Sequence, residues 1–238
     1  PPATDEAATK RAQELLERVI TAMGGAARLD AVRTLRETGS KKVEHKGEAV
    51  DNNDIVVWGY PDRVATEYTW GKDSWRSAVV GDTGWFVGPG DQRPMHRQQI
   101  EAMRRAHLGH NVVHLLHSRG RSEFVCARIA PGHVEADGKR IEVERVVVAL
   151  NGATTTISID PRADRIVALE YRGRGPNLAF GRVEKIFTEY AKFDDLALPV
   201  RPLTRFDGEA VPQDTEERVQ TEVNVRIDAK VFTPPTDK

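Results

Sequence analysis

The sequence contains very little cysteine, because Cys126 is its single thiol among 238 residues. An intrachain disulfide is therefore impossible, and a zinc site built from several cysteines is excluded. A cysteine-poor chain is compatible with any redox compartment, so the scarcity assigns none. With 39% hydrophobic and 30% charged residues, the composition is instead typical of a folded globular protein.

The chain also lacks an excess of one charge and lacks long apolar runs. Its 35 Lys and Arg residues balance 36 Asp and Glu residues, which leaves a formal net charge of −1. Such a chain has no global field that would attract nucleic acid, so no nucleic-acid partner is expected. No window approaches the roughly 18 apolar residues of a membrane span, and we expect a soluble protein that does not span a membrane.

Recognisable catalytic motifs are missing as well. The sequence has no Gly-x-Ser-x-Gly elbow, no His-Glu-x-x-His helix and no set of kinase motifs. The glycine-containing segment 173–177 lacks the Lys-Ser/Thr of a phosphate-binding loop and is interpreted as a mobile loop. We therefore expect a non-enzymatic protein with no catalytic residue and no cofactor.

The first residues, 1–8, are expected to form a flexible leader. They begin with Pro1-Pro2 and lack the basic and apolar regions of a signal peptide. A proline-rich leader that runs into a helix is what remains after an export signal is cleaved, although a shortened expressed segment would look the same. The expected location is the periplasm or cell envelope, with the signal peptide removed.

Two segments have helical periodicity. Near the start, apolar residues recur at helical spacing up to Met23, Gly24-Gly25 then stop the helix, and a helical turn over 26–31 follows. The segment Arg97 to Ser118 interrupts the later strand rhythm with a second helical arc, and we predict one helical insert there. The apolar positions of the two segments are Ala12, Leu15, Leu16, Val19, Ile20, Met23, Leu108, Val112, Leu115 and Leu116.

From Val32 onward the pattern alternates with a period of two, as half-buried strands require. Glycine-containing turns, among them those at Gly47, Gly71 and Gly81, separate the runs, and Asn151-Gly152 is the strongest hairpin signal. The strands predicted most clearly are Arg63 to Trp70, Ser122 to Ile129, Arg140 to Leu150, Ala153 to Asp160, Arg165 to Arg172, Val183 to Phe193, Val200 to Phe206 and Glu217 to Ile227.

These elements predict an α+β fold. Roughly ten strands follow one another without a linker, a repeat or a low-complexity tract, so one strongly curved antiparallel sheet is simpler than two domains. We expect this sheet to form an incomplete barrel that encloses, or is lidded by, the N-terminal helix and the mid-chain insert. The predicted single domain covers residues 9–238.

Four segments carry a resemblance to a known family: Leu15-Leu16 through Met23-Gly24-Gly25, then 81–85 (GDTGW), then 157–160 (ISID), and finally 223–227 (VNVRI) ahead of Phe232 and Pro234. In their order and spacing they resemble the LolA-like family of bacterial outer-membrane lipoprotein-sorting proteins. The resemblance implies a half-barrel with helices at its mouth and an apolar concavity that shelters acyl chains. It also implies lipids or acylated proteins as partners, together with components of the envelope membranes.

Aromatic and aliphatic residues of the early strands are the expected ligand-binding positions. A concave sheet is either filled by its own side chains or occupied by a ligand, and the four tryptophans, which include Trp75, all lie in this region. Ordinary core or rim packing is the simpler explanation of such rings. The predicted ligand-binding residues are Trp58, Val64, Tyr68, Trp70, Trp85, Val223 and Val225.

Four histidines in the insert offer an alternative. On one continuous helix His107, His110, His114 and His117 would fall within an arc of about 80°. Neighbouring pairs with a third ligand could hold zinc, copper or nickel, whereas the simpler interpretation is the polar flank of a helix. A pH-responsive lid is a further hypothesis.

The leading hypothesis is a non-enzymatic envelope protein that binds a lipid, a lipoprotein acyl group or a similar amphiphile in the concave apolar face. The alternatives are a metal-binding protein or metal-dependent hydrolase built on the histidines, and a structural module that docks a partner. Stoichiometric metal in the purified protein would favour the metal-based alternative.

Overall fold

The computed structural model describes residues 6–45, 48–150, 152–174, 179–200, 202–211 and 218–234. These residues form four α-helices, two short 3-10 helices and sixteen strands, and all strand pairings in this part of the chain are antiparallel. The predicted α+β class with antiparallel sheets is confirmed. No helix in the described ranges combines the length and the hydropathy that a membrane crossing requires.

The strands belong to two seven-stranded sheets and one two-stranded ribbon, and not to one sheet of about ten strands. Each seven-stranded sheet keeps two edge strands, so neither closes into a barrel. Contacts group the residues into two compact units, Pro1–Ala31 with Gly109–Val211 and Val32–Leu108 with Pro212–Lys238. Each unit combines two separate stretches of chain, so the two units are not consecutive domains along the sequence. One domain over residues 9–238 stays a prediction.

The first unit holds a sheet with the strand order β15-β14-β11-β10-β9-β8-β7. Two of the strand boundaries differ from the predicted ones, because the run from Val183 to Phe193 is divided between β11 and β12 and the run around Val200 is divided between β13 and β14. The elements of this unit are α1 (Glu6–Ala22), α2 (Ala26–Asp30), α4 (Val112–His117), η1 (Ser118–Gly120), β7 (Val125–Ala136), β8 (Lys139–Leu150), β9 (Ala153–Asp160), β10 (Arg165–Arg174), β11 (Phe180–Ile186), β12 (Glu189–Phe193), β13 (Leu196–Val200), β14 (Leu203–Phe206) and β15 (Glu209–Ala210).

Helix α1 packs its apolar side on this sheet and contacts β7 and β10. The predicted apolar positions Leu15, Leu16, Val19 and Ile20 are all buried. The helix ends where the sequence predicts, and the carbonyl of Met23 then accepts a hydrogen bond of 2.8 Å from the backbone N–H of Ala197. The N-terminal helix is thus tied to the β12–β13 ribbon by its last turn.

The mid-chain insert is not one helix, which corrects the prediction. Helix α3 (Arg97–His107) ends in the second unit, and α4 begins in the first unit after Asn111. Asn111 takes an extended conformation, and its side-chain oxygen accepts a 2.9 Å hydrogen bond from the N–H of His114. This arrangement is an N-cap, which starts a new helix where periodicity alone suggests continuity.

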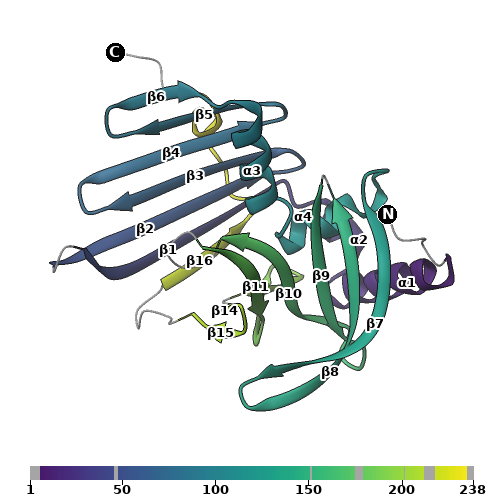
Figure 1. The fold of residues 1–238 in the computed structure, drawn as a ribbon. Helices are drawn as coiled ribbons and strands as arrows, with labels where there is room; N and C mark the ends of the chain where they lie inside the picture. Colours follow the sequence, from purple (N-terminus) through teal and green to yellow (C-terminus); the bar gives the residue numbers. More distant parts are fainter. Residues whose placement is uncertain are drawn as a thin grey trace. The chain divides into compact units, whose positions relative to one another are not determined.

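The second unit is a meander with the strand order β16-β1-β2-β3-β4-β5-β6 (Figure 1). Turns at Gly71 and Gly81 lie where the sequence predicts them, whereas Gly47 and Asn151 lie outside the described residues. The elements are β1 (Thr34–His45), β2 (Glu48–Gly59), β3 (Arg63–Trp70), β4 (Asp73–Val80), β5 (Thr83–Gly88), β6 (Asp91–Pro94), α3, β16 (Arg218–Val223) and η3 (Ala229–Phe232).

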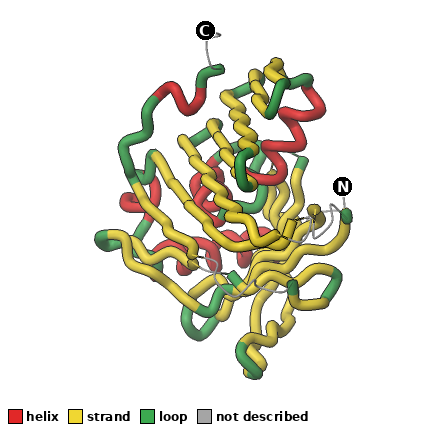
Figure 2. Tube along the Cα trace, turned by 90° about the vertical axis from the view of Figure 1, so that its left-hand side faces the viewer, coloured by secondary structure: helices red, strands yellow, loops and turns green. Residues whose placement is uncertain are grey.

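Each face of the β16–β6 sheet carries a helical element (Figures 1 and 2). On the η3 face, Trp85 packs with Phe232, and its indole N–H donates to the Phe232 carbonyl at 3.2 Å. On the α3 face, the indole N–H of Trp58 donates to the carbonyl of His107 at 3.0 Å. We use the names α3 face and η3 face below for these two sides.

Strand β16 is shorter than the run from Glu217 to Ile227 predicts, and it ends at Val223. Asn224 has a φ of 53°, which takes the backbone out of the extended region although apolar and polar residues continue to alternate. Its side-chain oxygen accepts a 2.7 Å hydrogen bond from Arg33 N, and its own N–H donates to Thr34 O at 2.9 Å. Asparagine tolerates this conformation, so the chain turns toward η3 at this point.

We expect Asn224→Ala to destabilise the protein by about 1–2 kcal/mol, because alanine disfavours positive φ and leaves the Arg33 N–H without its acceptor. Urea unfolding monitored by circular dichroism measures this change. Asn224→Gly keeps the backbone freedom and removes the same acceptor, so it separates the two contributions. Equal stability of Asn224→Ala and the parent protein would contradict the prediction.

Candidate functional site

Five of the seven predicted ligand-binding residues share the α3 face of the β16–β6 sheet. Trp58 lies opposite Val64 in the β2–β3 register, and Val223 lies opposite Leu35, which in turn faces Trp58. Alternation along β3 then places Tyr68 and Trp70 on the same side as Val64. Sequence periodicity therefore brings these side chains together on one surface.

The remaining two predicted residues lie elsewhere. Trp85 points to the η3 face, because it pairs with Ala78 in the neighbouring strand and packs on Phe232. Val225 follows the end of β16 and belongs to no strand. Neither residue lies on the α3 face, because alternation does not reveal which side of β5 carries Trp85, nor the break at Asn224. A ligand-binding role for the seven residues stays a prediction.

One end of the α3 face is a packed core. Trp58 is 5% exposed and Val64 is fully buried, and α3 packs against β4 there with Ile100 and Met103 buried. The hydrogen bond from Trp58 to His107 fixes the last turn of α3 on this end. These side chains support the site and do not present a surface for a ligand.

The other end of the α3 face is open and aromatic. Trp70 is 45% exposed and Tyr68 is 37% exposed, which is unusual for large apolar side chains that share a strand. Trp75 lies directly opposite Tyr68 in the β3–β4 register and is half-buried, as is Phe86 in β5. We call these four residues, Tyr68, Trp70, Trp75 and Phe86, the aromatic row.

Gly88 forms the floor of the aromatic row where Trp75 and Phe86 meet. A Cβ atom at Gly88 would lie 2.9 Å from Cδ1 of Trp75 and 3.2 Å from Cε1 of Phe86. A residue with a side chain at this position would therefore displace at least one ring. The absence of a side chain allows the two rings to converge over β5.

Acidic side chains lie next to the aromatic row. Asp54 is opposite Tyr68 on β2, and Asp73 is opposite Trp70 on β4. Burial raises the pKa of Tyr68 to about 12, and the negative charge of Asp54 adds to this increase, while a hydrogen bond with Thr66 acts in the opposite direction. The Tyr68 phenol therefore stays neutral across the physiological pH range, and the nearby Asp54 carboxylate disfavours its ionisation.

Trp75 and Phe86 are the members of the row that the expected ligand set omits. The signal for Trp75 is present in the sequence, because a two-residue turn at Gly71-Lys72 pairs Trp70 with Asp73 and so places Trp75 opposite Tyr68. Phe86 has no comparable local signal. Its place depends on the β4–β5 register, in which it faces Ser77.

The four histidines do not form one stripe. His107 ends α3, His110 precedes α4, and only His114 and His117 lie within α4. His110 stacks on Tyr171 with a ring separation of 3.6 Å, and its Nδ1 lies 2.9 Å from the hydroxyl of Thr155. Because that hydroxyl donates to Gly109 O at 2.8 Å, it accepts from Nδ1–H of His110.

Metal-ligating side chains do not gather in the part of the chain that the structure describes. Among those residues, no group of three or more His, Cys, Asp or Glu side chains lies close enough to hold an ion. Cys126 is buried in β7, and burial raises the pKa of its thiol to about 11. A thiol of this kind is a poor nucleophile at neutral pH.

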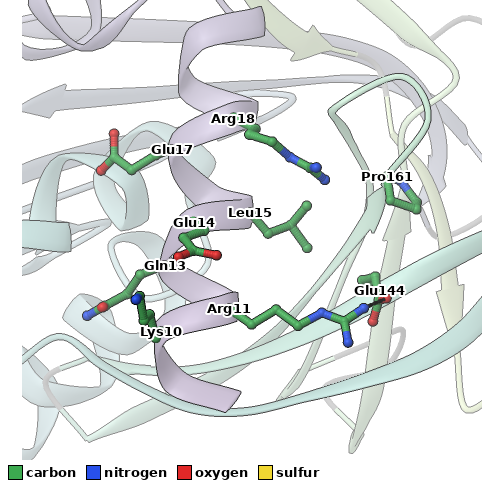
Figure 3. A pocket seen from close by; sticks show the side chains of 9 residues that line it. All are labelled: Lys10, Arg11, Gln13, Glu14, Leu15, Glu17, Arg18, Glu144 and Pro161. Carbon is green, nitrogen blue, oxygen red and sulfur yellow. Dashed lines mark hydrogen bonds and ion pairs between the residues drawn. The ribbon is translucent and has the colours of Figure 1, made fainter. Parts of the chain in front are cut away.

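Hollows also lie outside the aromatic row, and two are bordered by residues that the structure describes. In the first unit, a charged groove of about 900 Å³ follows α1, and the ion pair of Arg11 with Glu144 crosses it (Figure 3). In the second unit, a hollow of about 380 Å³ on the η3 side is bordered by Trp85, Pro94 and Phe232. The groove along α1 is lined by Lys10, Arg11, Gln13, Glu14, Leu15, Glu17, Arg18, Glu144 and Pro161.

Comparison with known proteins shows the fold but no close relative. No protein-family model matches the sequence, and no curated protein matches it either. A crystal structure of a DUF1329 family protein from Desulfovibrio piger is similar over 94% of this chain and 97% of its own, with a TM-score of 0.50 and 8% identity. At this identity the likeness establishes the fold alone.

Two further solved structures are similar over 93% of this chain and 97% of their own, each with a TM-score of 0.46. One is a putative outer membrane lipoprotein-sorting protein domain from Vibrio parahaemolyticus, at 9% identity. The other is the LolA superfamily protein NE2245 from Nitrosomonas europaea, at 11% identity.

Proposed function

We propose that this chain is a non-enzymatic binding protein that holds an amphiphile, such as a lipid or the acyl group of an acylated protein, on the aromatic row. The observation that carries the proposal is the unequal covering of one sheet. Helix α3 fills one end of the α3 face, whereas Tyr68 and Trp70 remain exposed at the other end. A contiguous group of exposed, large apolar rings is more often a binding surface than a surface that stays in contact with water alone.

The physical driving force is the removal of alkyl chain and ring surface from water. Each buried methylene contributes about 0.8 kcal/mol, and micromolar affinity corresponds to about 8 kcal/mol. A chain of about ten carbons reaches this affinity without a specific hydrogen bond when its methylenes are fully buried, and a longer chain is needed when one side stays in water. Flat rings suit such a chain because they offer a large contact area with few rotatable bonds.

The expected location supports the same proposal. The sequence resemblance to lipoprotein-sorting proteins implies an envelope protein, and a carrier in that compartment would exchange its ligand with envelope membranes or acylated proteins. A direct check is organic extraction of untagged protein purified from its native envelope fraction, followed by mass spectrometry. A stoichiometric alkyl-chain compound in the extract would identify the natural ligand class.

The site itself is tested by titrating the apo-protein with decanol in a calorimeter. We expect the double variant Tyr68→Ala/Trp70→Ala to bind decanol about 30-fold more weakly, because two rings worth about 1 kcal/mol each leave the contact surface. Neither change reaches the packed end of the sheet, so the unfolding midpoint should remain close to that of the parent.

Phe180→Ala is the matched control, because Phe180 is 66% exposed on β11 and lies outside the aromatic row. Its decanol affinity should equal that of the parent protein. If Phe180→Ala and the double variant weaken decanol binding equally, the aromatic row is not the binding site. If the parent protein binds no decanol, the proposed function fails.

A further inference from the structure

We infer that the aromatic row selects a ligand with a trimethylammonium head group, held against the rings of Tyr68 and Trp75 beside the Asp54 carboxylate. The inference rests on the proposed function, because it assigns the head-group chemistry of a ligand at the same face. It adds a property that burial of an alkyl chain does not require, namely a preference for positive charge.

The strand register aligns the groups that such a cation needs. Asp54 of β2, Tyr68 of β3 and Trp75 of β4 are direct neighbours across three adjacent strands on the α3 face. Adjacent strands lie about 4.8 Å apart, so roughly 10 Å separates the backbone positions of Asp54 and Trp75. A cation placed over the middle strand is therefore within reach of both rings and the carboxylate.

Aromatic rings attract cations because the face of the ring carries negative charge density. The attraction acts within about 6 Å of the ring centroid, and quaternary ammonium groups are a frequent ligand of aromatic clusters. Tyrosine and tryptophan are better partners than phenylalanine for this interaction. The aromatic row contains Tyr68, Trp70 and Trp75, so three of its four members belong to the favoured types.

The charges around the row complement a cation and disfavour an anion. Asp54, Asp73 and Glu37 all have register positions on the α3 face, with Glu37 opposite Val56. Two cations of the described strands have register positions on the same face, so the three carboxylates outnumber them: Lys41 is opposite Asn52, which is opposite Trp70, and Arg93 is opposite Phe86. The guanidinium of Arg93 lies 5.2 Å from the Phe86 ring centre, and its Nε donates to Asp91 at 3.0 Å.

The Arg93–Phe86 contact also shows that this part of the face accommodates a cation over a ring. Arg93 reaches Phe86 from the edge strand β6, while Trp75 and Tyr68 lie one and two strands farther in than Phe86. At Gly88 no side chain covers Trp75 from the β5 side. The inner rings are therefore the ones that a ligand would meet, with Asp54 on their far side.

A series of ligands with one alkyl chain and three head groups tests the inference: decyltrimethylammonium, decanol and decanoate, each titrated below its micelle concentration. We expect decyltrimethylammonium to bind about 10-fold more tightly than decanol, and decanoate to bind more weakly than decanol. In Asp54→Asn, the cation preference should fall about fivefold while decanol binding is unchanged.

Asp51→Asn is the matched control, because Asp51 is exposed on the same strand but alternates to the opposite face. Tyr68→Leu is a second variant, since it removes the ring while keeping an apolar side chain, and it should also reduce the cation preference. Circular dichroism establishes that each variant is folded before it is titrated.

The outcomes separate the inference from the proposed function. Equal binding of the cationic and neutral ligands, or an Asp54→Asn variant that keeps the full cation preference, would overturn the head-group assignment and leave the amphiphile site intact. Failure of all three ligands to bind would overturn both. A cation preference that Asp54→Asn and Tyr68→Leu reduce, and that Asp51→Asn does not, would support the inference.

Discussion

Replacing Gly24 with alanine is expected to lower the free energy of unfolding by about 3 kcal/mol or more, because two separate penalties coincide at this residue. Gly24 has a φ of 124°, a conformation that residues with a Cβ rarely adopt. A Cβ atom there would also lie 2.3 Å from the backbone carbonyl oxygen of Asp195. That oxygen belongs to the turn of the β12–β13 ribbon, so it cannot rotate away as the end of a side chain would.

Gly25→Ala provides the matched control for this prediction. Gly25 also has a positive φ, 95°, yet a Cβ at this position would meet no atom within 4 Å. We therefore expect Gly25→Ala to cost about 1–2 kcal/mol from backbone strain alone. Urea denaturation of both variants measures the difference. Equal losses would mean that the approach of Asp195 to Gly24 does not constrain the fold.

Trp58→Ala is expected to cost about 3–5 kcal/mol, which would make it the most damaging change on the α3 face. The indole is 5% exposed, packs under α3 and donates its N–H to the His107 carbonyl. Truncation leaves a cavity and an acceptor without its donor, and both effects destabilise the native state. Equilibrium unfolding in urea, monitored by circular dichroism, gives the value.

Two companion variants assign the cause. Trp58→Phe keeps most of the packing and removes the hydrogen bond, so its loss should be about 1–2 kcal/mol. Trp70→Ala, at an exposed ring of the same face, should cost less than about 1 kcal/mol. A result in which Trp70→Ala destabilises the protein as much as Trp58→Ala would show that the open end is structural core and would weaken the binding proposal.

The contrast between Trp58 and Trp70 separates two roles that look alike in the sequence. Both are tryptophans on or beside predicted strands of the same early meander, and both are plausible lining residues of a concave sheet. Helix α3 decides between them, because it covers the end of the face where Trp58 lies and leaves Trp70 exposed. Substitution of Trp58 should accordingly lower the stability of the protein, whereas substitution of Trp70 should lower its affinity for the ligand.

Local patterns determined most of the secondary structure. The apolar spacing up to Met23 gives α1, and the period-two alternation gives β3 and the strand from Ala153 to Asp160 with the predicted bounds. It also places Val64, Tyr68 and Trp70 on one side of β3. These features depend on interactions between residues close together in the chain, so their signals are visible in the sequence.

The sequence was less informative wherever one residue interrupts a regular pattern. Asn111 caps a new helix within the predicted insert, and Asn224 ends β16 although the alternation continues to Ile227. A single side-chain hydrogen bond decides each case, and periodicity averaged over a window does not detect it. The predicted histidine stripe depended on an unbroken helix and is absent for this reason.

Only the tertiary structure decided how strands pair and which faces are covered. The division into two seven-stranded sheets, the placement of Trp85 against Phe232, and the meeting of Trp75 with Phe86 over Gly88 all follow from register and from contacts between distant segments. Alternation fixes which residues share a side of one strand, because successive side chains point in opposite directions. It does not fix which side a helix will cover, because that depends on the packing of segments far apart in the chain.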